Sequence, residues 1–415
     1  MKNTGKYLYC SKLRCRSRFT LCVILVFLSC SLAFSHDFGL ILDQNAGVGS
    51  MGSQTYSEYT GMLIPRFSTF IADRGYLYIS AGLSVEFKDD WFIIPELLRT
   101  EFSWQFDKGF LSPGLLTTGR MYYSDPLGFV AEGLFDGVYY TFDMMDLGLL
   151  SAGMWYTGLL YKNRANVMMT TRDLDRMGSR LDYKDFANTY FAPSRFFTAI
   201  EWEPQRDRDL YRLNLSFIAQ FDLTGDDFHT QYLVGNLVIP FNSFILNLGS
   251  SFELMNVSNE LGFAFAGIAS VILELPFRYD NELTVSLSTS SGQFGNVSIN
   301  AYIPITARYP GRILRENFSA LTIISADYIT MLAPNFSVGA STAYFIRNDL
   351  YTSMLYGQSN GYFMGAEFYG SLLWSVLSDL QINVGAGIFL PQLGNSARNA
   401  DPIWRVEIGA ILSIR

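Results

Sequence analysis

The sequence predicts an all-β fold, a transmembrane antiparallel up-and-down β-barrel of about 18 strands (range about 14–20), after a cleaved signal peptide. Two observations carry this prediction. Apolar and polar residues alternate along segments of about 10–13 residues, enough for a tilted strand to cross a bilayer. Aromatic residues make up 16% of the chain, and Tyr and Trp fall near the segment ends, where interfacial girdles lie in such barrels.

The first 35 residues are organised like a secretory signal peptide. A basic region without acidic residues precedes an apolar run from Leu21 to Phe34, which is too short for a permanent membrane helix. A retained anchor and a lipoprotein acylated at Cys30 are the alternatives. We expect residues 1–35 to be the signal peptide and residues 36–415 to form the barrel.

Cleavage changes both the cysteine content and the charge. It would remove all four cysteines and six basic residues, which leaves 24 Lys and Arg against 38 Asp and Glu, a net charge of −14 instead of −8. An exported chain without cysteine has neither disulfide bridges nor thiolate metal ligands. A chain this acidic is not expected to bind nucleic acid.

The alternation assigns a face to each strand residue. In a membrane barrel the apolar face contacts lipid and the polar face lines the lumen. A soluble β-sandwich or a β-solenoid would bury the apolar face instead. We expect a first set to face lipid: Val338, Ile382, Val384, Val406, Ile408 and Leu412. We expect a second set to face the lumen: Ser337, Gln381 and Asn383.

Turn residues alternate with longer connections, as the short periplasmic turns and longer outer loops of such barrels do. The longer connections are predicted at 48–57, 163–192, 223–228, about 291–317, 348–361 and 391–402. The count of 18 requires that 281–317 is one strand followed by an outer loop. A separate strand over "SINAYIPITARY" would break the parity.

A glycine motif near the start of the barrel has the spacing of a dinucleotide-binding loop. Gly47, Gly49 and Gly52 spell G-x-G-x-x-G, and Asp73 lies where a ribose-binding carboxylate is expected. That site requires the glycines to open a helix, whose N-terminus holds the pyrophosphate. Here an alternating strand follows, so the motif indicates a loop or strand end, and we expect no cofactor.

Histidine is nearly absent, which limits acid–base chemistry. Only His36 and His229 occur. The pair Asp227 and His229, with Asp173 and Asp175 upstream, resembles the catalytic couples of the omptin outer-membrane proteases. Omptins are smaller barrels of about ten strands, and the likeness covers only these positions. We expect no catalytic residues.

The acidic residues of the 163–192 connection also approach a calcium-loop pattern. Asp173, Asp175 and Gly178 are suitably placed, but Met177 occupies a position that needs an oxygen ligand. We expect no defined metal site. Loose calcium binding by acidic outer loops stays open.

Charged residues near mid-strand on polar faces are candidates for lining a pore. They are Arg120, Glu132, Arg212, Glu253, Glu367, Arg405 and Glu407. Arg405 and Glu407 lie two residues apart on one face, so they either create a transverse field or pair with neighbouring strands and brace the wall. The 163–192 connection is either a solvated surface loop or folds inward as a constriction. Its constriction candidates are Arg172, Asp173, Asp175, Arg176 and Arg180.

With its signal peptide, alternating strands and turn parity, the chain resembles bacterial outer-membrane β-barrel proteins of the porin type. The resemblance implies a non-enzymatic channel for passive diffusion of small hydrophilic solutes. It also implies outer-membrane lipid, the barrel-assembly machinery and periplasmic chaperones as partners. Such chains usually end in an aromatic residue, whereas this one ends with Ile414 and Arg415.

Two alternative functions remain open at this point. The stretch from Phe38 to Gly52 is similar in rhythm to the N-terminus of long-chain fatty-acid transporters. These are 14-stranded barrels with a plugged lumen, and their Asn-Pro-Ala motif is missing here. The second alternative is a structural or adhesive surface protein that acts through its outer loops.

Overall fold

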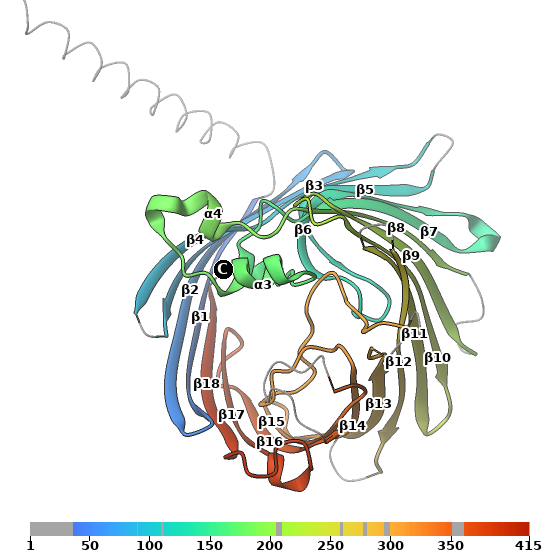
Figure 1. Cartoon of the computed structure of the whole chain (residues 1–415). Helices are drawn as coiled ribbons and strands as arrows, with labels where there is room; N and C mark the ends of the chain where they lie inside the picture. Colours follow the sequence, from blue (N-terminus) through green and yellow to red (C-terminus); the bar gives the residue numbers. More distant parts are fainter. Residues whose placement is uncertain are drawn as a thin grey trace, which may run out of the picture.

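The described chain forms one closed barrel. A computed structural model describes residues 36–414 except 89, 109–111, 205–209, 258–259, 277–279, 294–298 and 351–360, so the predicted signal peptide lies outside the described residues. The described part contains 18 strands in one antiparallel sheet, in which each strand pairs with its neighbours in sequence. Strands β1 and β18 pair and close the ring (Figure 1). The predicted barrel is confirmed, and the sandwich is excluded.

The strands are β1 (His36–Met51), β2 (Gln54–Ile71), β3 (Gly75–Phe87), β4 (Trp91–Phe106), β5 (Gly114–Ser124), β6 (Glu132–Asp143), β7 (Leu149–Tyr156), β8 (Arg195–Glu203), β9 (Arg212–Asp222), β10 (Phe228–Pro240), β11 (Phe244–Val257), β12 (Glu260–Glu274), β13 (Asn281–Ser290), β14 (Leu321–Ala333), β15 (Phe336–Arg347), β16 (Phe363–Ser375), β17 (Leu380–Leu390) and β18 (Ile403–Ile414). The connections contain short helices: η1 (Met145–Leu147), α2 (Lys162–Ala165), α3 (Thr171–Gly178), η2 (Tyr183–Asp185), α4 (Phe186–Tyr190) and η3 (Pro391–Leu393). Among the described residues, no helix has the length and apolarity needed to cross a membrane.

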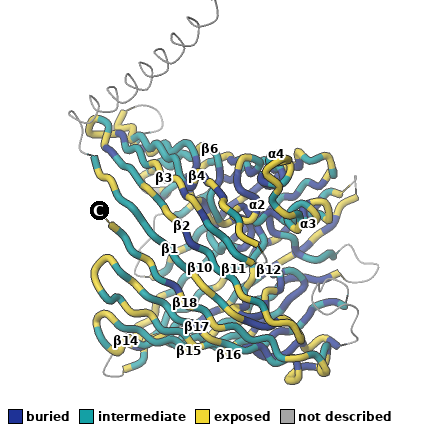
Figure 2. The backbone as a smooth tube through the Cα atoms, turned by 90° about the vertical axis from the view of Figure 1, so that its left-hand side faces the viewer, coloured by how far each residue is buried: buried dark blue, intermediate teal, exposed yellow. Residues whose placement is uncertain are grey.

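The two ends of the barrel differ. The connections β1–β2, β3–β4 and so on lie at one end, which we call the loop end. The connections β2–β3, β4–β5 and so on lie at the other, the turn end, together with both ends of the described chain. The strands are inclined to the barrel axis, and helices α2, α3 and α4 gather at the loop end (Figure 2).

Cross-strand pairing separates the lumen face from the outer face. Arg405 pairs with Gly387, and Gly387 pairs with Tyr369, so these three residues share a face. That face is the lumen, because a loop inside the ring places a guanidinium over the Tyr369 ring. The alternate residues Val406 and Ile408 are 44% and 54% exposed on the outside, as predicted. Closure leaves lipid no sheet edge at the β1–β18 junction.

An arginine on the outer face should therefore be far more costly than one in the lumen. We expect Ile408→Arg to destabilise the barrel by about 2–4 kcal/mol, because it places a charge in the hydrocarbon layer. Asn383→Arg on the lumen face of β17 is the control and should cost much less. Urea unfolding in lipid vesicles measures both. A larger cost for Asn383→Arg would contradict the assignment of faces.

The glycine motif lies at the end of β1 and in the tight hairpin that follows, which agrees with the prediction of a strand end. Strand β1 ends at Met51 and β2 begins at Gln54, so the predicted long connection 48–57 is instead a two-residue turn. Gly52 has a φ of +61° there, a left-handed conformation that glycine adopts without strain. No helix follows the motif, and Asp73 lies in the β2–β3 turn.

The ambiguous segment after residue 281 is one strand and a long inward connection. Strand β13 ends at Ser290, and residues 299–320 form no named strand. Pro304 and Pro310 lack the N–H that a strand would donate, and Tyr302 is fully buried inside the ring. Strand β1 contains most of the Phe38–Gly52 stretch, which is part of the wall. The 14-stranded, N-terminally plugged pattern of fatty-acid transporters is therefore not what this chain forms.

Candidate functional site: the constricted lumen

Three connections at the loop end fold into the lumen: residues 125–131, 157–194 and 299–320. In Figure 1 the last of these is drawn in the interior of the ring. Backbone hydrogen bonds join the three. The Ile305 N–H donates to the Val130 carbonyl at 2.8 Å, and the Ala307 N–H donates to the Asn166 carbonyl at 2.8 Å. The three connections therefore form one layer across part of the lumen.

The 299–320 connection is attached first to the wall at β10 and β11. The Tyr232 hydroxyl donates to the Ile303 carbonyl at 2.6 Å, and the Ile303 N–H donates to Glu253 Oε2 at 2.8 Å. The Ser251 and Tyr302 hydroxyls are 2.9 Å apart. Glu253, predicted to line a pore, thus binds the backbone of this connection and is buried.

The same connection is attached to a second stretch of the wall, at β16. Glu367 accepts three backbone hydrogen bonds, from the N–H groups of Arg312 at 2.8 Å, Ile313 at 2.9 Å and Leu314 at 2.8 Å. Its side chain is buried by these contacts. The connection is therefore tied to the wall at two places by Glu253 and Glu367, which sequence reasoning had selected for their position but not for this use.

The 125–131 connection is held by an internal carboxylate and a stacked cation. Asp125 accepts hydrogen bonds from the N–H groups of Leu127, Val130 and Ala131 at 2.8–3.0 Å. Burial raises the pKa of Asp125, and these backbone donors act in the opposite direction. The Arg308 guanidinium lies 4.5 Å from the centre of the Phe129 ring, and burial lowers the pKa of Arg308.

Apolar side chains fill the space between this layer and the wall. The hydrophobic core of the described chain lies there, inside the ring. Its fully buried large members from the three connections and the wall include Phe129, Phe135, Trp155, Phe197, Tyr302, Leu314 and Phe318. Water and solutes are excluded from this part of the lumen because its interior is packed.

The 157–194 connection is fixed by a buried ion triad. Arg195, at the start of β8, contacts Asp173 Oδ2 and Asp222 Oδ1, each at 2.7 Å. All three side chains are at most 1% exposed. Asp173 also forms a capping box with Thr170 at the start of α3.

The predicted constriction residues of this connection divide into two groups. Asp173 lies in the ion triad, and Arg176 Nε donates to the Phe191 carbonyl at 2.9 Å, so both hold the connection together. Arg172, Asp175 and Arg180 lie at the surface. Arg172 contacts Asp226 at 3.4 Å, and Arg180 pairs with Asp90. The constricting layer includes 299–320, which the sequence had indicated as an outer loop.

A charged group lies at the edge of the packed core, on β2, β16, β18 and the 299–320 connection. Arg405 Nη2 is 3.0 Å from Glu407 Oε2 and also pairs with Glu58 on β2. The Tyr369 hydroxyl donates to Glu407 Oε1 at 2.7 Å. Arg312, exposed in the 299–320 connection, lies 5.1 Å from the centre of the Tyr369 ring. We call Glu58, Arg312, Tyr369, Arg405 and Glu407 the passage cluster.

The wall around the passage cluster is made of small side chains. Lumen-facing positions there include Gly47, Gly339, Ser371, Gly385, Gly387 and Gly409. Sequence reasoning found Arg405 and Glu407 but missed Arg312, Glu58 and Tyr369. Arg312 lies in the connection predicted at about 291–317, which was expected to be an outer loop. Glu58 directly follows the connection predicted at 48–57.

The remaining pore-lining candidates lie elsewhere. Arg120 binds Asp136 through two hydrogen bonds of 2.8 and 2.9 Å and is buried within the wall. Glu132 accepts a hydrogen bond from Tyr122, whose ring is on the outer side of β5. Arg212 is exposed near the turn end, 3.9 Å from Glu203. The structure does not bring these three residues to the passage cluster.

The residues considered for catalysis and metal binding have other partners. His229 Nδ1 accepts a hydrogen bond from the Asp222 N–H at 3.1 Å, while Asp173 pairs with Arg195. In the described ranges, no group of three or more His, Cys, Asp or Glu side chains is arranged to hold a metal ion.

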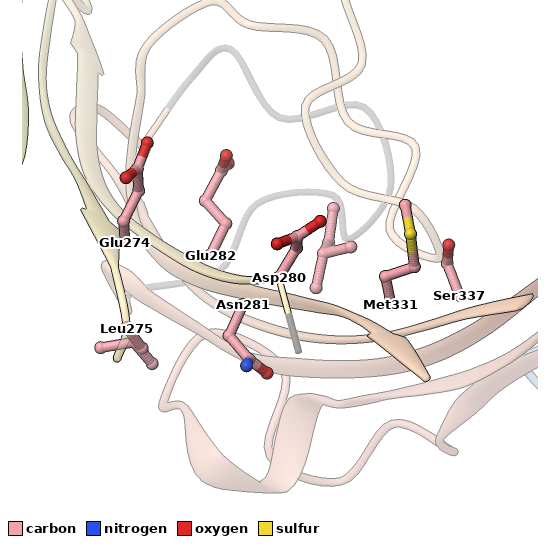
Figure 3. A pocket seen from close by; sticks show the side chains of 8 residues that line it. Glu274, Leu275, Asp280, Asn281, Glu282, Met331 and Ser337 are labelled. Atoms are coloured by element: carbon pink, nitrogen blue, oxygen red, sulfur yellow. The ribbon is translucent and has the colours of Figure 1, made fainter. Parts of the chain in front are cut away.

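An acidic cavity of about 450 Å³ lies at the turn end. Glu274, Asp280 and Glu282 extend to one side of it, and Leu275 and Asn281 to the other (Figure 3). Glu274 and Glu282 are cross-strand partners on the lumen face of β12 and β13.

The closed ring of 18 antiparallel strands with inward loops defines the fold of a porin-type β-barrel. Three solved structures illustrate the similarity. OccK2 (OpdF) of Pseudomonas aeruginosa superposes with a TM-score of 0.63 at 11% identity, over 92% of this chain and 98% of that one. OccK5 (OpdH) of the same organism gives 0.61 at 12% identity over 91% and 98%. OccAB4 of Acinetobacter baumannii gives 0.58 at 8% over 91% and 98%.

At these identities the likeness establishes the fold. No protein-family model matches the chain, and no curated protein matches it.

Proposed function

We propose that this protein is an outer-membrane channel for passive diffusion of small hydrophilic solutes, without enzymatic activity. One observation carries the proposal: the inward loops fill part of the lumen with a packed core, while β18, β1 and β2 contribute no buried residue to that core and carry small side chains and most charges of the passage cluster. In a fully plugged barrel, packed side chains would cover the wall on all sides. Here this part of the wall carries charges and glycines, which suit a water-filled path.

The passage cluster would act on solutes electrostatically. Arg312 extends from the loop and Arg405 from β18, and the carboxylates of Glu58 and Glu407 lie between and beside them. Charges of opposite sign at a constriction create a field across the path, which orients dipolar solutes. OccK2 was also crystallised with glucuronate, so a small sugar acid is the first solute to test.

The same proposal includes the surroundings of the barrel. Its outer apolar face would contact outer-membrane lipid, and its insertion would need the barrel-assembly machinery and periplasmic chaperones. The sequence of residues 1–35 supports export before assembly.

Single-channel recording in planar bilayers tests the proposal. We expect stepwise currents from the wild-type protein. Arg312→Ala and Arg405→Ala should shift ion preference towards cations, because each removes a positive charge from the path while the carboxylates stay.

The matched control is Arg172→Ala, which removes an exposed arginine outside the cluster and should leave ion preference unchanged. A barrel that inserts into the bilayer but passes no current would overturn the channel proposal. The adhesive or plugged alternatives would then be preferred.

A further inference from the structure

In the described part of the barrel wall, strands β4 and β5 separate at the loop end and leave a seam. Strands β4 and β5 pair only from Phe106↔Gly114 to Thr100↔Arg120. Strand β4 continues to Trp91 and stays paired with β3 over that stretch. Its other edge, facing β5, has no strand partner between Trp91 and Arg99.

Side chains take the place of the missing strand. The Ile93 N–H donates to the Tyr183 hydroxyl at 3.0 Å, and this hydroxyl donates to the Ile93 carbonyl at 2.9 Å. The Tyr190 hydroxyl donates to the Pro95 carbonyl at 2.7 Å. Pro95 has no N–H to satisfy, which is why proline is tolerated at strand edges.

At the end of the seam where β4 and β5 begin to pair, an ion pair holds the strands. Arg120 donates to the Leu97 carbonyl of β4 and to the Leu159 carbonyl at 3.1 Å, and it is paired with Asp136 of β6. Between Leu97 and the loop end, the hydrogen bonds that reach the open β4 edge come from the 157–194 connection. The segment 181–192, which includes α4, lies beside β4 in Figure 1.

The seam is apolar on both sides of the wall. Inside, Ile94 of β4 packs with Tyr161 and Tyr190, and Phe186 and Phe191 lie against this group. Outside, Ile93 and Tyr183 are 55% and 56% exposed, and Leu97 and Leu159 are also exposed. On the lumen side, Arg164 contacts Glu96 at 3.2 Å.

This arrangement differs from a continuous ladder of backbone hydrogen bonds between two strands. A barrel in lipid needs every backbone N–H and C=O satisfied, and a ladder does this with bonds that break only if the strand unfolds. Here the bonds come from the side chains of Tyr183 and Tyr190 on the 157–194 connection and, at Leu97, from Arg120, so they can break while both strands stay folded. Removal of the connection would leave an apolar gap between lumen and lipid.

We propose that residues 181–192 are a removable plug in the barrel wall, whose displacement opens a lateral path from the lumen to the lipid for amphipathic solutes. The polar head of such a solute would stay near Arg164 and Glu96, and its apolar chain would pass between β4 and β5. This activity is additional to diffusion along the barrel axis.

Cross-linking tests the plug in the full-length protein. All four cysteines precede residue 36, so Ile93→Cys/Tyr183→Cys would give the barrel a unique thiol pair, and both positions are exposed. A short bis-maleimide with a reducible linker would tether the plug to β4. In intact cells we expect the tethered protein to lose the accelerated uptake of radiolabelled dodecanoate, and reduction of the linker to restore it.

Channel currents measured on the same tethered protein should be unchanged, because neither residue belongs to the passage cluster. Each single-cysteine variant treated with the reagent controls for modification alone. As a second measurement, Tyr183→Phe removes both hydrogen bonds to Ile93 and should increase dodecanoate uptake. Tyr309→Phe, in a loop outside the seam, should not.

The outcomes separate this proposal from the channel proposal. Currents together with dodecanoate uptake that tethering does not reduce would overturn the lateral path and leave the channel intact. Absence of any dodecanoate uptake above cells lacking the protein would also overturn it. Tether-sensitive uptake without currents would support the path and contradict the channel.

Discussion

Replacing Arg195 with methionine is expected to destabilise the loop end of the barrel by about 3–5 kcal/mol. The guanidinium lies between Asp173 and Asp222 at 2.7 Å from each, and all three side chains are shielded from water. Without the cation, two carboxylates remain buried and repel each other. The loss is large because the buried charge left behind, more than the broken contact, is costly.

Urea unfolding in lipid vesicles and protease cleavage of the 157–194 connection measure this effect. Arg172→Met is the matched control, because Arg172 pairs with Asp226 at 3.4 Å while 65% exposed, and such surface pairs contribute about 0–1 kcal/mol. The double variant Arg195→Met/Asp173→Asn should lose less unfolding free energy than the sum of its single variants. The reason is that it also removes one of the two carboxylates that would stay buried without a cation. Equal effects of Arg195→Met and Arg172→Met would contradict the triad's role.

Replacing Glu367 with alanine is expected to release the 299–320 connection from β16. Three backbone N–H groups lose a charged acceptor, and hydrogen bonds to charged groups contribute about 1.5–3 kcal/mol each. We expect a local loss of about 3 kcal/mol or more, together with larger and noisier single-channel currents. Glu367→Gln keeps one acceptor oxygen and should give an intermediate result.

Trypsin cleavage after Arg315, which is exposed in this connection, provides a readout independent of conduction. Cleavage should become faster in Glu367→Ala. Glu282→Ala is the control, because Glu282 is a lumen-facing carboxylate near the turn end that contacts only its own strand neighbour Thr284 in the described structure. Unchanged cleavage in Glu367→Ala would show that the connection does not depend on this carboxylate.

The strands and their faces could be predicted because they depend on local pattern. A strand in a membrane wall shows one face to lipid and one to the lumen, so alternation identifies both the strand and the outward residues, as Val406 and Ile408 illustrate. Parity of the connections then gave the strand number. The unpaired edge of β4 also has a sequence signal, because Pro95 lies within an alternating segment and proline is tolerated at strand edges.

The functions of the lumen charges could not be predicted in the same way. Glu253, Glu367 and Arg405 look alike in sequence, since each is a charge on the polar face of a strand. Glu253 and Glu367 bind the backbone of an inward connection, whereas Arg405 belongs to the passage cluster. This difference depends on where residues 299–320 fold, and that is decided by contacts with strands far away in the chain.

The sequence by itself therefore determined a closed antiparallel barrel and the orientation of its strands, because the alternation of period two is imposed residue by residue by lipid on one side. The tertiary structure alone decided which part of the lumen is packed, which carboxylates are buried and where β4 and β5 separate. The physical reason is that irregular connections carry no periodic constraint. Their positions follow from hydrogen bonds and apolar packing between segments such as 125–131, 157–194 and 299–320, which are far apart in the sequence.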